Sequence, residues 1–172
     1  MGELSPIILG IDPGTHATGF GVISQSGTRL IHIQSGSLRA PKSAPLEQRL
    51  LHIHQELQEI IRNTQPHFIA IETIFYSKNV RSAITLAHAR GIILLAAAQA
   101  GIPVQEYSPM EVKQATVGYG RAQKDQVMHM IRHLFRIPRE EDLSSSDQSD
   151  ALAVALCHLN TYRTQKSLER AI

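Results

Sequence analysis

Four acidic residues in this sequence border strongly apolar segments, a placement that is costly for a charge unless it is paired, solvated or bound to a metal. The four residues are Asp12, Glu72, Asp147 and Asp150. Without a cation, four acids brought together would repel one another, and their pKa values would rise. With divalent ions they would form a site of hard oxygen ligands, the set that magnesium and manganese prefer.

Metal-assisted phosphodiester hydrolysis is the chemistry that such a site best supports. Two ions held roughly 4 Å apart can activate water on one side of a phosphodiester and stabilise the leaving oxygen on the other. The sequence offers no His-Cys zinc set, no P-loop lysine and no arrangement that we can assign as a Ser-His-Asp site. His129 and His133 have the spacing of zinc ligands, but with no Cys or third His nearby we interpret them as a solvated pair.

Each acid also has a simpler structural interpretation. Asp12 precedes Pro13-Gly14 and could accept backbone N–H bonds from that turn, so on these residues alone both interpretations stay open. Asp147 and Asp150 stand in the predicted first turn of a helix, where the dipole and capping favour acids. Against this, Ser146 already supplies a cap, and a wholly apolar helix follows the second of these acids.

The first acid is expected at the end of a strand in a small antiparallel sheet. The apolar run Ile7–Ile11 predicts a buried strand, with Pro13-Gly14 as the turn behind it. Two further strands are predicted at Gly19–Ser24 and Arg29–Leu38, joined by a hairpin turn at Ser26-Gly27. The chain therefore opens as a three-strand antiparallel meander.

A helix and a fourth strand then bring the second acid beside the first. Apolar residues recur at helical spacing from Leu46 to Ile61, and His67–Glu72 is a short apolar strand that also ends in an acid. Two strands separated by a crossover helix are parallel neighbours whose carboxyl ends lie side by side. Asp12 and Glu72 would then meet at the edge where open α/β sheets place ligands.

The rest of the chain is predicted to be mainly helical, with one more strand. A basic, glycine-containing loop at 118–124 precedes a helix whose core stripe spans 127–134, and the last helix starts at Ser146. We expect the tail beyond Asn160 to be frayed. Before that loop we predict an apolar helix at Asn79–Ala100, a strand at Val104–Tyr107 and a short helix at Ser108–Val117.

Composition places the chain among ordinary soluble domains. With 172 residues, 42% hydrophobic and 19% charged content, we predict one domain over 1–172, ordered over about 6–160. The longest apolar run, Ile92–Ala98, is shorter than the about 20 residues that cross a bilayer. Cys157 is the only cysteine and no signal-peptide pattern opens the sequence, so we expect a reducing, cytoplasmic setting. The net charge of +2 permits a nucleic-acid partner without arguing for one.

Several motifs together resemble the RuvC family of crossover (Holliday) junction resolvases, which have a ribonuclease H-like fold. The resemblance covers residues 6–160, with the motifs in family order. An Asp-x-Gly motif alone is weak, because sugar-kinase and actin-like ATPases carry it too, but the joint set at this length is specific. The motifs are strand-Asp12-Pro-Gly, Ile71-Glu72, Ala89-Arg90-Gly91, Val112-Lys113-Gln114 and Asp147-x-x-Asp150-Ala-Leu-Ala.

The resemblance implies a fold and a set of site residues. The fold would be α/β, with a five-stranded mixed sheet (an antiparallel meander plus two parallel strands) and helices on both faces. The four acids would bind two Mg²⁺ per subunit, with Mn²⁺ able to substitute. Lys113 and Lys124 would hold phosphates or stabilise transition-state charge. We also count Arg81 and Arg121 among the DNA-binding residues.

One aromatic residue is implied in DNA binding. Phe75 matches the aromatic that family members stack against bases at the opened junction centre, and an aromatic beside a metal site is a natural stacking platform. Its structural alternative is a core side chain folded under its own loop. Tyr76 beside it departs from the family in side-chain type, and we attach no role to it.

The resemblance also implies partners. The family acts as a homodimer that cuts two strands of like polarity, and a two-fold dimer presents two sites to a nearly two-fold junction. The predicted helix 79–100 is the candidate dimer contact, and the RuvA-RuvB branch-migration complex is an implied partner. Two rival hypotheses remain: a non-catalytic junction- or RNA-binding member of the ribonuclease H-like superfamily, and an actin-like ATP-binding phosphotransferase, for which the chain is too short.

Overall fold

A single five-stranded sheet organises the described part of the protein. The computed structural model describes residues 5–73, 80–138 and 146–170. The strand order is β3-β2-β1-β4-β5, with antiparallel pairs among the first three strands in the chain and parallel pairs for β1–β4 and β4–β5. The predicted mixed sheet is therefore confirmed. The strands are β1 Ile8–Asp12, β2 Ala17–Ser26, β3 Arg29–Arg39, β4 Phe68–Glu72 and β5 Val104–Tyr107.

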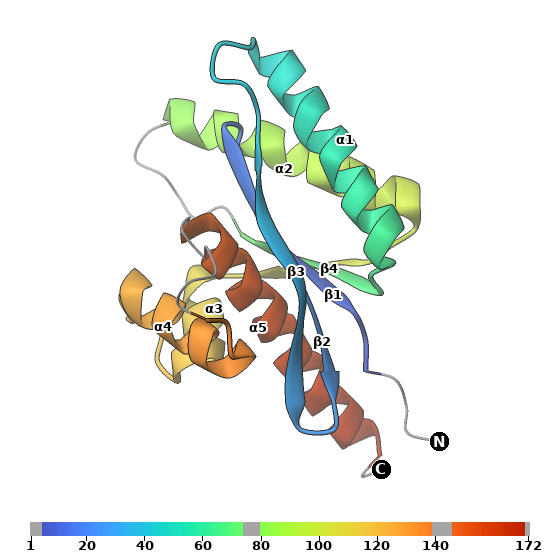
Figure 1. Ribbon diagram of the computed structural model, residues 1–172, viewed down its shortest axis with the longest axis vertical. Helices are drawn as coiled ribbons and strands as arrows, with labels where there is room; N and C mark the ends of the chain where they lie inside the picture. The colour runs from blue at the N-terminus through green and yellow to red at the C-terminus, as the bar shows by residue number, and fades with distance from the viewer. Residues whose placement is uncertain (1–4, 74–79, 139–145, 171–172) are drawn as a thin grey trace.

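Helices cover both faces of this sheet, as predicted (Figure 1). Helices α1 and α2 pack on one face, where their apolar side chains form a buried cluster with Leu9 and Ile11 of β1. Helices α3, α4 and α5 pack on the other, in a second cluster that includes Ile8. Neighbouring residues of β1 thus point into opposite layers, as the alternation of a strand requires. The helices are α1 Leu46–Thr64, α2 Val80–Ala100, α3 Pro109–Val117, α4 Lys124–Phe135 and α5 Ser146–Glu169.

Several element bounds differ from the sequence-based expectations, and two of them concern α4 and α5. Helix α5 continues to Glu169, although a frayed tail was expected beyond Asn160. Lys124 is the first residue of α4 rather than part of the basic loop before it. Helix α5 begins at Ser146, as predicted, and the Ser146 hydroxyl lies 3.4 Å from Asp147 Oδ1. Terminal residues are the least predictable part of a helix, because capping and packing decide them together.

Glycines let α5 lie directly against the sheet. A Cβ on Gly10 would stand 2.1 Å from the carbonyl oxygen of Ala151, and one on Gly19 would stand 2.0 Å from that of Asp147. Gly21 would likewise meet Leu152. These strand positions must therefore lack side chains for the helix backbone to approach this closely.

Helix α2 leaves an apolar stripe uncovered. Its buried face consists of Ala89, Ile93, Ala96 and Ala97, whereas Ile84 is 54% and Leu95 52% exposed. By length and composition it is the one helix within the described residues that could cross a membrane, with a mean hydropathy of 1.4. The uninterrupted apolar run Ile92–Ala98 considered in the sequence is shorter than the apolar helix that the structure shows. A core helix of a soluble protein passes the same test, and α2 packs on the sheet through its buried face.

Candidate active site

Two of the predicted acids end adjacent parallel strands. Asp12 is the last residue of β1 and Glu72 the last of β4, and these strands pair in register from Ile8–Phe68 to Ile11–Ile71. Their side chains line one cavity of about 360 Å³, together with Asp150 from α5. The topology inferred from the sequence thus brings these three acids to one place.

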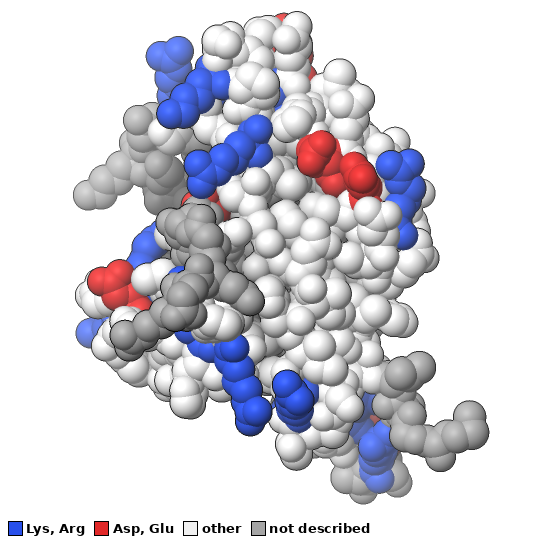
Figure 2. Space-filling view, in the orientation of Figure 1, with Lys and Arg blue, Asp and Glu red and all other residues white. Residues whose placement is uncertain are grey.

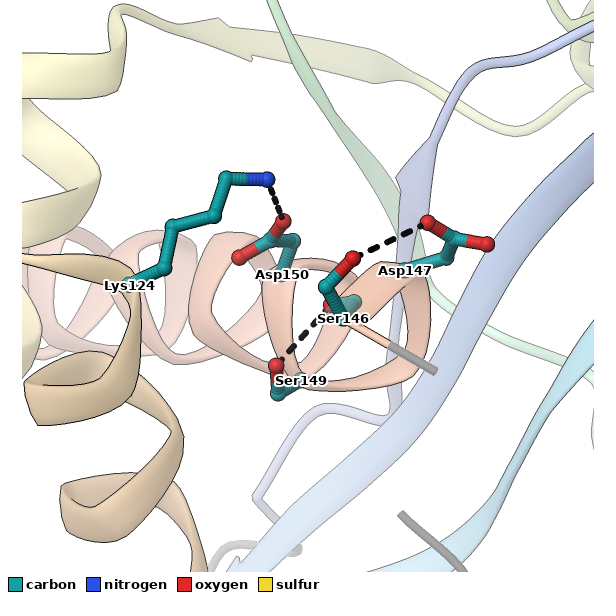
Figure 3. Close-up of polar contacts among 5 residues, drawn as sticks. All are labelled: Lys124, Ser146, Asp147, Ser149 and Asp150. Carbon is teal, nitrogen blue, oxygen red and sulfur yellow. Dashed lines mark hydrogen bonds and ion pairs between the residues drawn. The ribbon is translucent and has the colours of Figure 1, made fainter. Parts of the chain in front are cut away.

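Asp147 lies beside this cavity and does not line it. Figure 3 shows the carboxylate of Asp150 turned toward Lys124 and that of Asp147 turned toward the strands. Ser146 donates its hydroxyl to Asp147 Oδ1, and Ser149 donates to the carbonyl of Ser146 at 2.9 Å. Asp147 is still near enough for its charge to raise the pKa of Asp12.

Burial and the neighbouring negative charges raise the pKa values of two of the acids, Asp12 and Glu72. Burial, followed by the charges of Asp150, Glu72 and Asp147, raises the pKa of Asp12 to about 7, while Lys124 lowers it. Burial and then Asp150 raise the pKa of Glu72 as well. The site therefore carries more negative charge than its surroundings neutralise, a condition that a bound cation relieves.

Two lysines line the same cavity and supply part of the missing positive charge. Lys124 Nζ lies 3.1 Å from Asp150 Oδ2, and this hydrogen bond is the first cause that raises the pKa of Lys124. The Lys113 charge lowers the pKa of Glu72. Lys113 is carried by α3, whose start is fixed by a capping box between Ser108 and Glu111.

The donor chemistry fits a hard divalent cation, although the acids do not converge on one point. Within residues 5–73, 80–138 and 146–170, no three His, Cys, Asp or Glu side chains form a group that could hold an ion as they stand. The available donors are carboxylate oxygens, which suit magnesium or manganese. The lysine ammonium on Asp150 occupies one of these oxygens.

Two of the remaining predicted residues, Arg81 and Arg121, do not line this cavity. Phe75 lies outside the described residues. Arg121 is exposed in the segment before α4. Arg81 lines a separate cavity with Thr15, and Leu86 borders both that cavity and the acid-lined one.

Sequence reasoning missed the residue that shapes the loop after β1. Thr18 is fully buried; its hydroxyl donates to the Gly14 carbonyl at 2.6 Å and lies 3.3 Å from the Gly14 amide nitrogen. These contacts close the turn that follows Asp12. A threonine four residues beyond a Pro-Gly turn carries no distinctive sequence signal, so only the structure identifies it.

The family model and three of the similar proteins described below carry the same family name. The family model described as "Crossover junction endodeoxyribonuclease RuvC" matches residues 8–158. Curated proteins of that name from Desulfitobacterium hafniense and Syntrophotalea carbinolica are 44% and 48% identical over 155 residues, covering 90% of this chain and 93% and 94% of theirs. The T. thermophilus RuvC solved in complex with Holliday junction substrate has a TM-score of 0.86 at 32% identity, covering 93% of this chain and 96% of that one. The yeast mitochondrial resolvase Ydc2, at 14% identity and a TM-score of 0.61, shares the fold.

Proposed function

The chain belongs to the RuvC family of crossover junction endodeoxyribonucleases, and from this membership we propose that its acid-lined cavity is the site of phosphodiester cleavage. As a family member it resolves Holliday junctions. The observation that supports our assignment of the site is the convergence of Asp12, Glu72 and Asp150 on one cavity. We assign Asp147, beside that cavity, to the same set.

In the proposed mechanism these acids hold divalent cations while basic residues hold the DNA. The chemistry that bound magnesium would supply there is activation of the attacking water and stabilisation of the leaving oxygen. Asp12, Glu72 and Asp150 provide carboxylate ligands from two strand ends and one helix. Lys113 and Lys124, which line the same cavity, contact the scissile phosphate and stabilise its charge in the transition state. Phe75 stacks on bases at the junction centre.

The basic residues act locally in this proposal. Figure 2 shows Lys and Arg side chains spread over the visible face, at its upper edge and around α4, with no single basic patch. Junction selectivity therefore depends on placing two sites correctly, with phosphate contacts from the lysines and from Arg81 and Arg121.

We further propose that the chain works as a homodimer in the cytoplasm. Two copies present two sites to the junction and nick strands of like polarity at symmetric positions. The uncovered apolar stripe of α2 supports this arrangement, since a second copy would remove it from water. Docking on the RuvA-RuvB branch-migration complex is part of the same proposal.

Cleavage of a synthetic immobile four-way junction tests the acid site. We expect paired nicks with Mg²⁺ and none in EDTA. Asp12→Asn and Asp150→Asn should each keep junction binding but slow single-turnover cleavage by at least about a hundredfold, because a lost metal ligand removes transition-state stabilisation.

The matched control is Glu47→Gln, which makes a comparable acid-to-amide change in the first turn of α1 on the other face of the sheet. It should cleave like the unmodified protein. An Asp12→Asn or Asp150→Asn protein that cuts at the normal rate would remove that residue from the metal site. A protein that binds the junction without metal-dependent cutting would favour the non-catalytic alternative.

A further inference from the structure

One buried hydrogen bond connects the strand side of the acid site to its helix side. The Tyr107 hydroxyl lies 2.8 Å from Nδ1 of His158 and also has a side-chain hydrogen bond to Thr161 of α5. Tyr107 and His158 are nearly inaccessible to water, at 8% and 4% exposure. Tyr107 ends β5, and His158 lies in α5 about two helical turns beyond Asp150.

On the strand side, Tyr107 holds the backbone next to one of the acids. It pairs in register with Glu72 across the parallel strands β4 and β5. Its carbonyl oxygen accepts a hydrogen bond of 2.8 Å from the amide of Thr73. Any movement of Tyr107 along the strand direction would therefore move the residue that carries the Glu72 carboxylate.

On the helix side, His158 interrupts an apolar surface. The residues from Ala151 to Leu159 are all buried, and His158 is the one polar side chain among them. Its ring packs against Phe68, the first residue of β4, with centroids 4.7 Å apart. Burial lowers the His158 pKa, which favours the neutral ring, and either tautomer of that ring can bond to a hydroxyl.

Stability alone does not account for this polar pair. Nε2 of His158 is buried and has no hydrogen-bond partner among the described residues. Leaving a buried polar nitrogen unpaired costs free energy, whereas an apolar side chain of similar volume would pack here without that loss. Unlike apolar packing, a hydrogen bond has a preferred distance and angle, so this bond restrains the relative position of the two residues.

The neighbouring contact needs such a directional restraint. Where α5 crosses β1 and β2, its backbone at Ala151 and Ala155 lies against Gly10, and Leu152 lies against Gly21. Glycine and alanine offer few side chains that interlock at this crossing, so resistance to sliding along the helix axis comes from larger buried side chains such as Leu152, and a directional bond adds to it. A shift of α5 there would change the distance between its acids and those of the strands.

We propose that the Tyr107–His158 hydrogen bond is a positioning contact that fixes α5 along its axis relative to β4, and so sets the separation of the Asp150 and Glu72 carboxylates. The inference rests on the proposed function, because it assumes that these two acids share the bound cation. Neither Tyr107 nor His158 lines the acid cavity, so both act through the acids.

The test removes the bond from each side and measures metal dependence. We expect His158→Leu to raise the Mg²⁺ concentration for half-maximal single-turnover cleavage about fivefold, the effect of one lost hydrogen bond, and Tyr107→Phe to raise it at least as much, because it also loses the bond to Thr161. Mn²⁺ binding followed by electron paramagnetic resonance, a readout independent of cleavage, should weaken by the same factor. Junction binding in EDTA should not change, and the double variant should be no worse than Tyr107→Phe alone.

Conservative rescue distinguishes positioning from general stability. His158→Asn retains a hydrogen-bonding atom near the place of Nδ1, so its Mg²⁺ midpoint should stay at the unmodified value while that of His158→Leu rises. Thr64→Val serves as the control, since it deletes a 2.7 Å hydroxyl bond to the Ile60 carbonyl in α1. It should lower stability and leave the midpoint in place.

Two outcomes separate this inference from the acid site itself. If Asp150→Asn still cleaves normally, the proposed acid site is wrong and the inference falls with it. If Asp150→Asn is inactive while Tyr107→Phe and His158→Leu keep the unmodified midpoint, only the positioning role is overturned. The paired comparison of His158→Asn with His158→Leu gives the same decision without any change at Tyr107.

Discussion

The ionisation of Asp12 links the acid site to pH. Its native pKa is raised to about 7, chiefly by burial, from an ordinary value of 3.8. Between these two values the native state holds a proton that the unfolded state has released. The free energy of unfolding of the metal-free protein must therefore fall as pH rises from about 4 to about 7, by up to about 4 kcal/mol.

Urea denaturation in EDTA measures this effect. We expect the unmodified protein to be less stable at pH 8 than at pH 5, and Asp12→Asn to lose much less stability over the same interval, since an amide does not titrate. Glu47→Gln, which alters an exposed acid in the first turn of α1, should follow the unmodified protein. Parallel curves for all three proteins would show that Asp12 is not the titrating group.

A second prediction concerns the role of the Lys113 charge in cleavage. Lys113 lines the acid cavity and forms no ion pair with an acid in the part of the chain that the structure describes, and its charge lowers the pKa of Glu72. Lys113→Ala should slow single-turnover cleavage by about tenfold or more at saturating junction, because charge in the transition state loses a stabilising partner. Lys42→Ala, in the segment between β3 and α1, is the control. Equal rates for both variants would reject the role.

The acids could be found from sequence, but their orientation could not. Asp12 and Glu72 end apolar runs. The helix between these runs predicts that the two strands are parallel, which places their last residues side by side. Nothing in the spacing of Asp147 and Asp150 shows that one faces the cavity and the other turns toward the strands. That difference depends on the rotation of α5 about its own axis, which tertiary packing sets.

At the scale of elements, the approach of α5 to the sheet depends on missing side chains. Gly19 pairs with Asp12 across β1 and β2, and the space of its absent Cβ is filled by the backbone of Asp147. One glycine thus stands between a strand acid and a helix acid. A sequence shows glycines readily, but it does not reveal which of them a helix will lie against.

Gly19→Ala should therefore displace the first turn of α5. We expect a loss of about 1–3 kcal/mol in the free energy of unfolding from overpacking, with a higher Mg²⁺ requirement for cleavage. Gly36→Ala is the matched control, since its Cβ would meet the Phe20 ring within the sheet and not α5. It should lower stability without changing the Mg²⁺ requirement. If Gly19→Ala and Gly36→Ala need the same Mg²⁺ concentration for cleavage, a displacement of the first turn of α5 does not affect the acid site.

Helix types and most bounds followed from the sequence because their patterns are local. Strand β5 and helix α3 match the predicted Val104–Tyr107 and the end at Val117, and a Ser-Pro start with a capping box explains this accuracy. The extension of α5 to Glu169 was missed because polar residues dominate its last turns. The family predicted from the joint motifs is confirmed by the comparisons.

At the scale of the whole molecule, α2 is the element on which the proposed homodimer depends. Its exposed residues Val80, Ile84, Leu94 and Leu95 recur on one helical face, with Ala87, Gly91 and Ala98 between them. A Cβ on Gly91 would meet nothing within 4 Å. An apolar stripe interrupted by small residues suits close contact with the same helix of a second copy.

The structure also changes how this interface must be tested. Ile93 is fully buried in the core of its own chain, so a charge there would unfold the protein rather than separate a dimer. Leu86 lines the acid cavity, so changing it would affect catalysis directly. Ile84 and Leu95 are the informative positions, because they are about half exposed and lie outside both regions.

Ile84→Glu with Leu95→Glu should yield a folded monomer by light scattering, since two buried like charges on each side of a two-fold contact repel. The monomer should bind a junction more weakly, and its two nicks should lose their coupling, so that singly nicked junctions accumulate in place of resolved duplexes. Leu51→Glu, at a 56% exposed position of α1, is the control and should remain dimeric with paired nicks. A dimer that survives both α2 charges would locate the two-fold contact on another face of the molecule. Single nicks from an intact dimer would instead show that coupling between the two sites depends on something other than holding the copies together.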